Sequence, residues 1–238
     1  MNRSTWANRK PVVVTGAQKP IDLAITDARS NLLDSLRFAS HPRAHGTVIV
    51  FGGKVIAGTR AKKEFSKSYN AFSSINYPDI AVIHDDRIVF YIDDKEQSTK
   101  RLRFYHAMDD RIFLLKLIPS IDPLVLENLA DSYDGLILES FGVGGLPDYG
   151  NHDFAAMIEK WTSAGKLVTM STQVTHEGSD MGIYKVGKVI KENFEILESY
   201  DMTLEATVTK MMWILAQTRD FEECKKLFYT TVNKDILF

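Results

Sequence analysis

Three loops carry residue types that could contact a small polar ligand. The first is 15–20, Thr-Gly-Ala-Gln-Lys-Pro, which directly follows the β-branched run 11–14. The second is 140–147, Ser-Phe-Gly-Val-Gly-Gly-Leu-Pro, and the third is 171–178, Ser-Thr-Gln-Val-Thr-His-Glu-Gly. Each follows an apolar run typical of a parallel strand, and open α/β sheets bind ligands beyond the carboxyl ends of their strands. We therefore expect ligand contacts from these loops, where glycine lets the backbone approach closely.

The third loop contains hydroxyl groups and a candidate base. Ser171, Thr172 and Thr175 could act as nucleophiles if His176 accepted their proton. Neighbours in sequence seldom form such a working pair, so a polar substrate-edge loop or a simple turn is the favoured interpretation. The second loop resembles a phosphate cradle only superficially, because it lacks the lysine and Ser/Thr of a P-loop and no helix opens directly behind it.

Lys63 is the candidate proton-handling cation. It ends the polar stretch 58–63, Gly-Thr-Arg-Ala-Lys-Lys. A lysine ammonium can lower the pKa of a nearby hydroxyl or relay a proton. Composition alone favours a solvated pair of surface lysines at this place.

Metal chemistry is not expected. The six histidines show no zinc-ligand spacing. The paired carboxylates are interpreted as solvated turn residues; they are Asp85-Asp86, Asp93-Asp94 and Asp109-Asp110. We expect neither a metal nor another cofactor.

The composition is that of an ordinary soluble globular protein. The chain has 238 residues, 45% hydrophobic and 25% charged, with a formal net charge of -2. So small a net charge gives no electrostatic reason to expect a nucleic-acid or membrane-surface partner. No segment approaches the run of about 20 apolar residues that a membrane span needs, and the first ten residues do not resemble a signal peptide.

Cys224 is the only cysteine, which excludes an internal disulfide and a cysteine-based zinc site. It lies in an amphipathic helical stretch, so a buried or half-buried structural thiol is favoured over a nucleophile. Disulfide-free chemistry suits a reducing cytosol, and we expect a cytoplasmic location.

The order of elements predicts an α/β protein of two domains. Residues 1–92 form the first predicted domain, 93–111 a charged linker and 112–238 the second domain, while 59–78 is expected to be an irregular loop. In the second domain, strands alternate with helices, which predicts a parallel sheet with helices on both faces. The predicted strands are 11–14, 47–51, 54–58, 80–83, 87–92, 113–118, 136–138 and 167–170. The predicted helices are 26–38, 123–130, 153–163, 203–217 and 221–229. The first of them opens on Thr26-Asp27, an expected N-cap pair that precedes Leu32, Leu33, Leu36 and Phe38 at helical spacing.

Several motifs, in order along the chain, together resemble the L-asparaginase family. The pattern Met202-Thr203-x-Glu205-Ala206 is similar to the cytoplasmic (type I-like) subtype rather than the periplasmic one. The other matching segments are 10–20 with 26–33, 58–63 with 71–78, 140–147 and Thr172-Gln173.

The resemblance implies an asparaginase-like two-domain, three-layer α/β/α fold with a flavodoxin-like parallel sheet in the carboxy-terminal domain. It also implies hydrolysis of L-asparagine, or alternatively L-glutamine, without a cofactor, in a homodimer or homotetramer. By its position in the matching segment, Lys63 corresponds to the catalytic lysine that the resemblance implies. Gly16, Ala17 and Gln18 match the substrate-binding loop whose backbone faces the substrate amide.

The family's two threonine motifs, Thr-Gly-Gly-Thr and His-Gly-Thr-Asp-Thr, do not occur among the 238 residues. His45-Gly46-Thr47 imitates the second motif but follows the 11–14 strand instead of preceding it, so we interpret it as coincidence. No nucleophile is identified. We therefore expect an amino-terminally truncated chain with an incomplete first domain that is inactive alone. Two alternatives stay open: a non-catalytic amino-acid-binding or interaction protein, and one half of a split enzyme.

Overall fold

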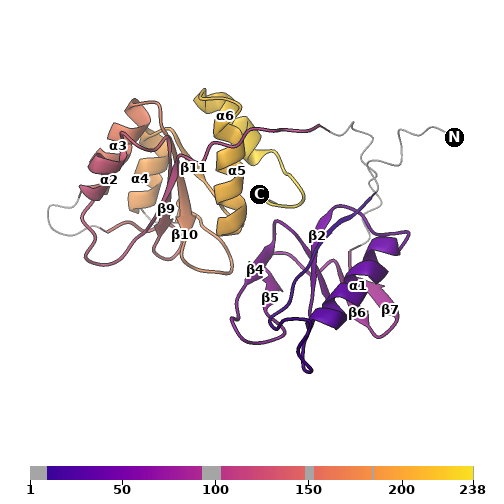
Figure 1. The fold of residues 1–238 in the computed structure, drawn as a ribbon. Coiled ribbons are helices and arrows are strands. Elements are labelled where there is room, and N and C mark those ends of the chain that lie inside the picture. Colours follow the sequence, from indigo (N-terminus) through magenta and orange to yellow (C-terminus); the bar gives the residue numbers. More distant parts are fainter. Residues whose placement is uncertain (1–9, 93–102, 148–152, 184, 238) are drawn as a thin grey trace. The chain divides into compact units, whose positions relative to one another are not determined.

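The chain folds into two compact units. The computed structural model describes residues 10–92, 103–147, 153–183 and 185–237. Unit 1 comprises Met1–Tyr105 with Asn233–Asp235, and unit 2 comprises His106–Val232 with Ile236–Phe238. Most of the predicted linker, 93–102, lies outside the described residues, so its boundaries stay a prediction. Figure 1 shows the elements of each unit.

Unit 1 is built on a five-stranded mixed sheet with the strand order β1–β2–β3–β6–β7. β1 runs parallel to β2, and the other neighbours are antiparallel. Gly52 and Gly53 have φ of 58° and 74°, the left-handed pair that a tight hairpin between β2 and β3 requires. These strands confirm the predicted ones; they are β1 Val12–Val14, β2 Thr47–Phe51, β3 Lys54–Ala57, β6 Ala81–His84 and β7 Arg87–Phe90.

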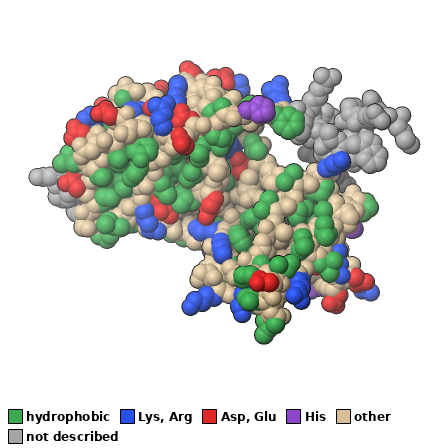
Figure 2. Space-filling model, viewed as in Figure 1, with side chains coloured by type: hydrophobic (Ala, Val, Ile, Leu, Met, Phe, Trp, Pro, Cys, Tyr) green, Lys and Arg blue, Asp and Glu red, His purple; other side chains and the backbone are tan. Residues whose placement is uncertain are grey.

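Helix α1, Ala28–Ser40, covers one face of this sheet. Its buried residues are Asn31, Ser35 and Phe38, so the inward face is largely polar. The leucines that mark this helix in the sequence point elsewhere, and Leu36 is 60% exposed. Figure 2 shows hydrophobic side chains at the surface over α1. Within the described residues, the apolar stripe of this helix therefore has no covering layer.

The expectation of an irregular loop over 59–78 is wrong. Strands β4, Ala61–Lys63, and β5, Phe72–Ser74, form a two-stranded antiparallel sheet there. The ring of Phe72 lies 5.1 Å from that of Phe51 in β2. Strands of three residues that contain lysine and serine have weak strand propensity, so the local sequence does not predict them. They form because they pack against the main sheet.

Unit 2 has a four-stranded parallel sheet with the order β11–β10–β9–β8. The strands are β8 Ile112–Lys116, β9 Gly135–Ser140, β10 Leu167–Thr172 and β11 Ile196–Glu198. Helices α2–α4 lie on one face and α5 and α6 on the other (Figure 1). These helices are α2 Val125–Leu129, α3 Phe154–Ser163, α4 Lys185–Asn193, α5 Leu204–Leu215 and α6 Phe221–Tyr229. The predicted three-layer α/β/α arrangement is confirmed.

The consecutive strand order explains the layers. Right-handed crossovers that always step in the same direction place α2, α3 and α4 on one face. Trp161 of α3 packs there, while Phe228 of α6 packs on the opposite face, and both are fully buried. The described part of this sheet has no reversal of strand order, the feature at which doubly wound sheets form a ligand crevice. Helix α4 and strand β11 were not predicted from the sequence.

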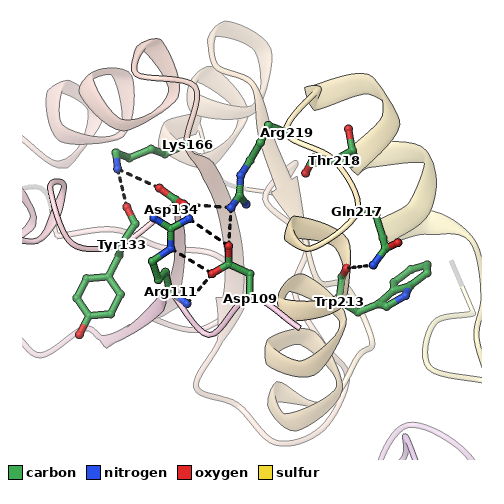
Figure 3. A network of polar contacts seen from close by, with 10 residues as sticks. Asp109, Arg111, Tyr133, Asp134, Lys166, Trp213, Gln217, Thr218 and Arg219 are labelled. Carbon is green, nitrogen blue, oxygen red and sulfur yellow. Dashed lines mark hydrogen bonds and ion pairs between the residues drawn. The ribbon is translucent and has the colours of Figure 1, made fainter. Parts of the chain in front are cut away.

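A charged network lies at the amino ends of β8, β9 and β10 (Figure 3). Asp109 contacts Arg111 at 3.2 Å, and Asp134 contacts both Arg111 and Arg219. Hydrogen bonds from Arg111, and then from Arg219, hold the pKa of Asp109 far below its usual value. Asp109 is therefore an ion-pair residue, which corrects the interpretation of Asp109-Asp110 as solvated turn residues.

Candidate active site

The loop after β1 presents an exposed backbone to solvent. Thr15, Gly16 and Ala17 are exposed, and a Cβ built on Gly16 would meet no atom within 4 Å. No described residue accepts a hydrogen bond from the backbone N–H of Gly16 or Ala17. The hydroxyl of Thr15 is engaged, because it donates to the carbonyl oxygen of Val50 at 2.7 Å. The front of the loop thus offers two free backbone donors.

The back of the same loop is held by two side chains of the α1 segment. The backbone N–H of Gln18 donates to both carboxylate oxygens of Asp27, at 3.0 and 2.9 Å, and that of Lys19 donates at 3.1 Å. The Asn31 amide donates to the carbonyl oxygen of Gly16 at 2.9 Å. The loop is therefore fixed from behind and open in front.

The interpretation of Thr26-Asp27 as a helix-capping pair holds for Thr26 only. Its hydroxyl accepts from the backbone N–H of Ala28 at 3.0 Å. The Asp27 side chain makes no capping hydrogen bond with α1 and points to the loop. Nothing in the capping pattern indicated this role.

Lys63 lies at the exposed end of β4, opposite Phe72 of β5. Within the described ranges its ammonium has no hydrogen bond or ion pair. Beyond it the chain turns back, with the N–H of Glu64 donating to the carbonyl oxygen of Ala71 at 2.8 Å. A free ammonium beside an exposed turn is suited to contact a ligand or a hydroxyl group.

Gln18 connects the two predicted parts of the site. Its side-chain amide donates to the carbonyl oxygen of Phe65 at 3.0 Å and to that of Ser68 at 2.9 Å. Both acceptors lie in the turn that follows Lys63. The Lys19 ammonium also lies 5.7 Å from the centre of the Tyr69 ring in this turn. The structure thus brings the 16–18 loop against the hairpin that carries Lys63.

The motif Gly58-Thr59-Arg60 has a structural role that the sequence did not reveal. Arg60 is fully buried, and its Nε donates to the carbonyl oxygen of Lys234. The Thr59 hydroxyl donates to the carbonyl oxygen of Asn233. The motif anchors residues 233–235 in unit 1.

The hydroxyl loops of unit 2 form no nucleophile–base pair in the described residues. The Thr172 hydroxyl donates to the carbonyl oxygen of Gly142 rather than to His176. Gln173 donates to the carbonyl oxygens of Leu117 and Glu139, at 2.7 and 3.0 Å. These side chains stiffen the carboxyl edge of the sheet, in line with the polar-loop interpretation.

The lookalike motif at 45–47 belongs to the sheet. The carbonyl oxygen of Gly46 accepts from the N–H of Val12 at 2.9 Å, and Thr47 begins β2. Across the described ranges, no three His, Cys, Asp or Glu side chains gather in a way that could hold a metal ion. None of the described helices has the length and apolar character of a membrane span.

Comparison with known proteins identifies the family. Residues 3–96 match the N-terminal asparaginase domain, and residues 111–228 match the glutaminase/asparaginase C-terminal domain. The L-asparaginase of Thermococcus kodakarensis is 37% identical over 226 residues, which cover 95% of this chain and 67% of that protein. The chain belongs to the asparaginase family. This confirms the resemblance drawn from the motifs.

Solved asparaginase structures share the fold of this asparaginase-family chain. The thermostable L-asparaginase from Thermococcus kodakarensis superposes with a TM-score of 0.90 at 35% identity, over 97% of this chain and 69% of that one. L-asparaginase I from Vibrio cholerae superposes with a TM-score of 0.83 at 25% identity, with the same coverage of both chains.

A second class of relative is one component of a glutamyl-tRNA(Gln) amidotransferase. The matching polypeptide of that enzyme from Pyrococcus abyssi is 29% identical over 237 residues, or 95% of this chain. The asparaginase-family chain spans 53% of the length of that polypeptide and about two-thirds of the Thermococcus asparaginase.

Proposed function

We propose that this asparaginase-family chain contributes the 16–18 loop and Lys63 to a site that hydrolyses L-asparagine to L-aspartate and ammonia. One observation carries the proposal: the Gln18 side chain joins a loop whose front N–H groups have no acceptor among the described residues to the hairpin that bears Lys63, which has no ion pair among them. The motifs that resemble asparaginases and the 37% identity to an L-asparaginase support the same reaction.

The chemistry of amide hydrolysis suits these groups. A hydroxyl gives up its proton and attacks the amide carbon, and the carbonyl oxygen becomes negative. The C–N bond then breaks as the nitrogen takes up a proton and leaves as ammonia, and water hydrolyses the resulting ester to release aspartate and restore the hydroxyl. Backbone N–H groups aimed at the developing oxyanion stabilise it, and those of Gly16 and Ala17 have no acceptor in the part of the chain that the structure describes. The positive charge of Lys63 would favour deprotonation of a nearby nucleophile hydroxyl.

The attacking hydroxyl is proposed to come from polypeptide outside these 238 residues. Neither family threonine motif occurs here. The hydroxyls of Thr15 and Thr172 each donate to a backbone carbonyl, which leaves them poorly placed to attack. We accordingly propose that the chain has no activity by itself.

The surface of unit 1 supports an additional segment. β1 is an edge strand in the described sheet, and its Val12 and Val14 are 57% and 50% exposed. Leu32 and Leu33 of α1 are 47% and 48% exposed. An open edge with exposed apolar side chains is an unstable combination that another strand and helix would relieve.

The test is ammonia release from asparagine by the purified chain, with and without the part of the Thermococcus kodakarensis asparaginase that the chain does not cover. We expect background rates alone and hydrolysis after addition of the segment. Robust activity from the chain alone would overturn the proposal, and Thr15→Ala and Thr172→Ala would then locate the nucleophile. Asparagine binding without ammonia release in either mixture would favour the non-catalytic amino-acid-binding alternative.

We propose a homodimer or homotetramer in the cytoplasm that prefers asparagine, with glutamine as the competing substrate. Light scattering of the purified protein measures the assembly size. Parallel assays with asparagine and glutamine decide the preference, and faster release from glutamine would contradict the proposal.

A further inference from the structure

Asp27 is a buried carboxylate without a cation. It is 5% exposed, and no described lysine or arginine pairs with it. An ionised carboxylate in such a place needs hydrogen-bond donors to replace its water. The donors are the backbone N–H groups of Gln18 and Lys19 and the amide of Asn31, the last at 3.2 Å. Successive backbone N–H groups form a concave anion site of this kind.

Asn31 links three segments from the same buried helix face. It is 2% exposed. Its amide nitrogen donates to Gly16 and to Asp27, while its amide oxygen accepts from the N–H of Gly52 at 3.0 Å. Gly52 lies in the β2–β3 hairpin, and a Cβ built on it would lie 3.0 Å from the carbonyl oxygen of Tyr69. Asn31 thus ties the 16–18 loop to α1 and to the β2–β3 turn.

The charge on Asp27 matters for this arrangement. Burial by itself raises the pKa of Asp27, but hydrogen bonds from the N–H groups of Gln18 and Lys19, from its own N–H and from Asn31 outweigh it and leave the pKa lowered. The carboxylate therefore remains ionised at neutral pH and keeps two acceptor oxygens. An amide at this position would have one acceptor oxygen and would turn an NH₂ donor toward other donors.

We propose that Asp27 and Asn31 are positioning residues that hold the 16–19 backbone in its ligand-facing conformation. Asp27 binds the back of Gln18 and Lys19, and Asn31 binds the back of Gly16. The free N–H groups of Gly16 and Ala17 then face solvent in a defined direction. The inference rests on the proposed function of this loop and names the residues that set its geometry.

The test compares Asp27→Asn and Asn31→Ala with Ser35→Ala in the full chain. Ser35 is the matched control, because it is buried on the same helix face and donates to the carbonyl oxygen of Asn31 at 2.7 Å without touching the loop. Amide hydrogen exchange of Gln18 and Lys19, measured by NMR, reports the positioning directly. We expect exchange to quicken by more than about tenfold in Asp27→Asn and to stay unchanged in Ser35→Ala.

A second measurement separates positioning from general stability. Asparagine is titrated into each variant, combined with the part of the Thermococcus kodakarensis asparaginase that the chain does not cover, while the amide shifts of Gly16 and Ala17 are followed. Weaker asparagine binding in Asn31→Ala than in Ser35→Ala, at an equal melting temperature, supports the proposal. Unchanged exchange and unchanged binding in Asn31→Ala would overturn it, even if Asp27→Asn failed to fold. Slow exchange in the unsubstituted chain together with no asparagine-induced shift would instead contradict the proposed function while the positioning role stood.

Discussion

The side-chain amide of Gln18 donates a hydrogen bond to the carbonyl oxygen of Phe65, two residues beyond Lys63. This contact spans 47 residues of sequence within unit 1. It joins the 16–18 loop, which offers backbone N–H donors, to the hairpin that carries the Lys63 ammonium, and the two form one assembly.

Replacing Gln18 should loosen this assembly. Gln18→Ala removes the donors to Phe65 and Ser68, and Gln18→Glu replaces them with oxygens that repel those carbonyl groups. We expect weaker asparagine binding in both variants and the larger loss in Gln18→Glu, on the order of tenfold or more. Isothermal titration of the complemented enzyme measures the affinity. Asparagine binding in both variants as tight as in the unsubstituted protein would contradict the role of the amide donors.

Lys63→Met should abolish most activity while leaving the fold intact. Lys63 is exposed and has no partner in the described residues, so its loss removes no stabilising contact. In the complemented enzyme we expect kcat to fall about 10²- to 10⁴-fold, the range typical of a lost proton-handling group. Lys62→Met is the matched control, because successive side chains of a strand point to opposite faces. Comparable losses in both variants would rule out a specific role for Lys63.

Asp109 should contribute stability only above acidic pH. Arg111 lowers the folded-state pKa of Asp109 below its ordinary value of 3.8. The ionised carboxylate therefore stabilises the fold fully at pH values above 3.8. The contribution shrinks as the pH falls below 3.8 and is gone below the folded-state pKa. We expect Asp109→Asn to lower the free energy of unfolding by about 1 kcal/mol at pH 7, since the network is partly exposed. Urea unfolding of both proteins at pH 7, 5 and 3.5 should show the difference shrinking only in the most acidic series.

Breaking the Lys191–Glu198 ion pair should be costly. The Glu198 side chain is 2% exposed and lies 2.6 Å from the Lys191 ammonium. Lys191→Met leaves that buried carboxylate without its cation. We therefore expect the free energy of unfolding to fall by about 1–3 kcal/mol. Lys188→Met, on the same helix, removes a pair that is 62% exposed on both sides and should change stability by less than about 0.5 kcal/mol. If thermal or urea unfolding showed the same loss of stability for Lys191→Met and Lys188→Met, the Lys191–Glu198 pair would have no special stabilising role.

Cys224 should react slowly in the folded protein. It is 1% exposed, and burial raises the pKa of its thiol, so little reactive thiolate is present. We expect iodoacetamide to modify it at least about tenfold more slowly than in the urea-unfolded chain. Mass spectrometry of timed samples gives the rates. Similar rates in both states would show that the thiol is accessible in the native fold.

Much of the fold could be predicted because local patterns were strong. β-branched runs such as 47–51 and the alternation of strands and helices in 112–238 identify most elements and the parallel sheet. The missed strands were short. Hairpin β4–β5 and strand β11 have three residues per strand and form only because packing on neighbouring elements offsets their weak propensity.

The candidate site was predicted only in part. The resemblance points to Gly16, Ala17, Gln18 and Lys63, but nothing in the local sequence indicates that Gln18 contacts the turn at Phe65. Asp27 looked like a helix cap, since an aspartate before an apolar helix usually is one. Its carboxylate instead binds the backbone of Gln18 and Lys19, a choice made by the fold of the loop over α1.

Residue types in their order along the chain were enough to establish the family, the two α/β halves and the absence of both threonine motifs from these 238 residues. Which side chains meet depended on the folded chain. Folding placed Asp27 and Asn31 behind the 16–19 loop and the Gln18 amide against the turn after Lys63. Such contacts join residues far apart along the chain, and buried polar groups must find whichever partners the fold brings within hydrogen-bonding distance.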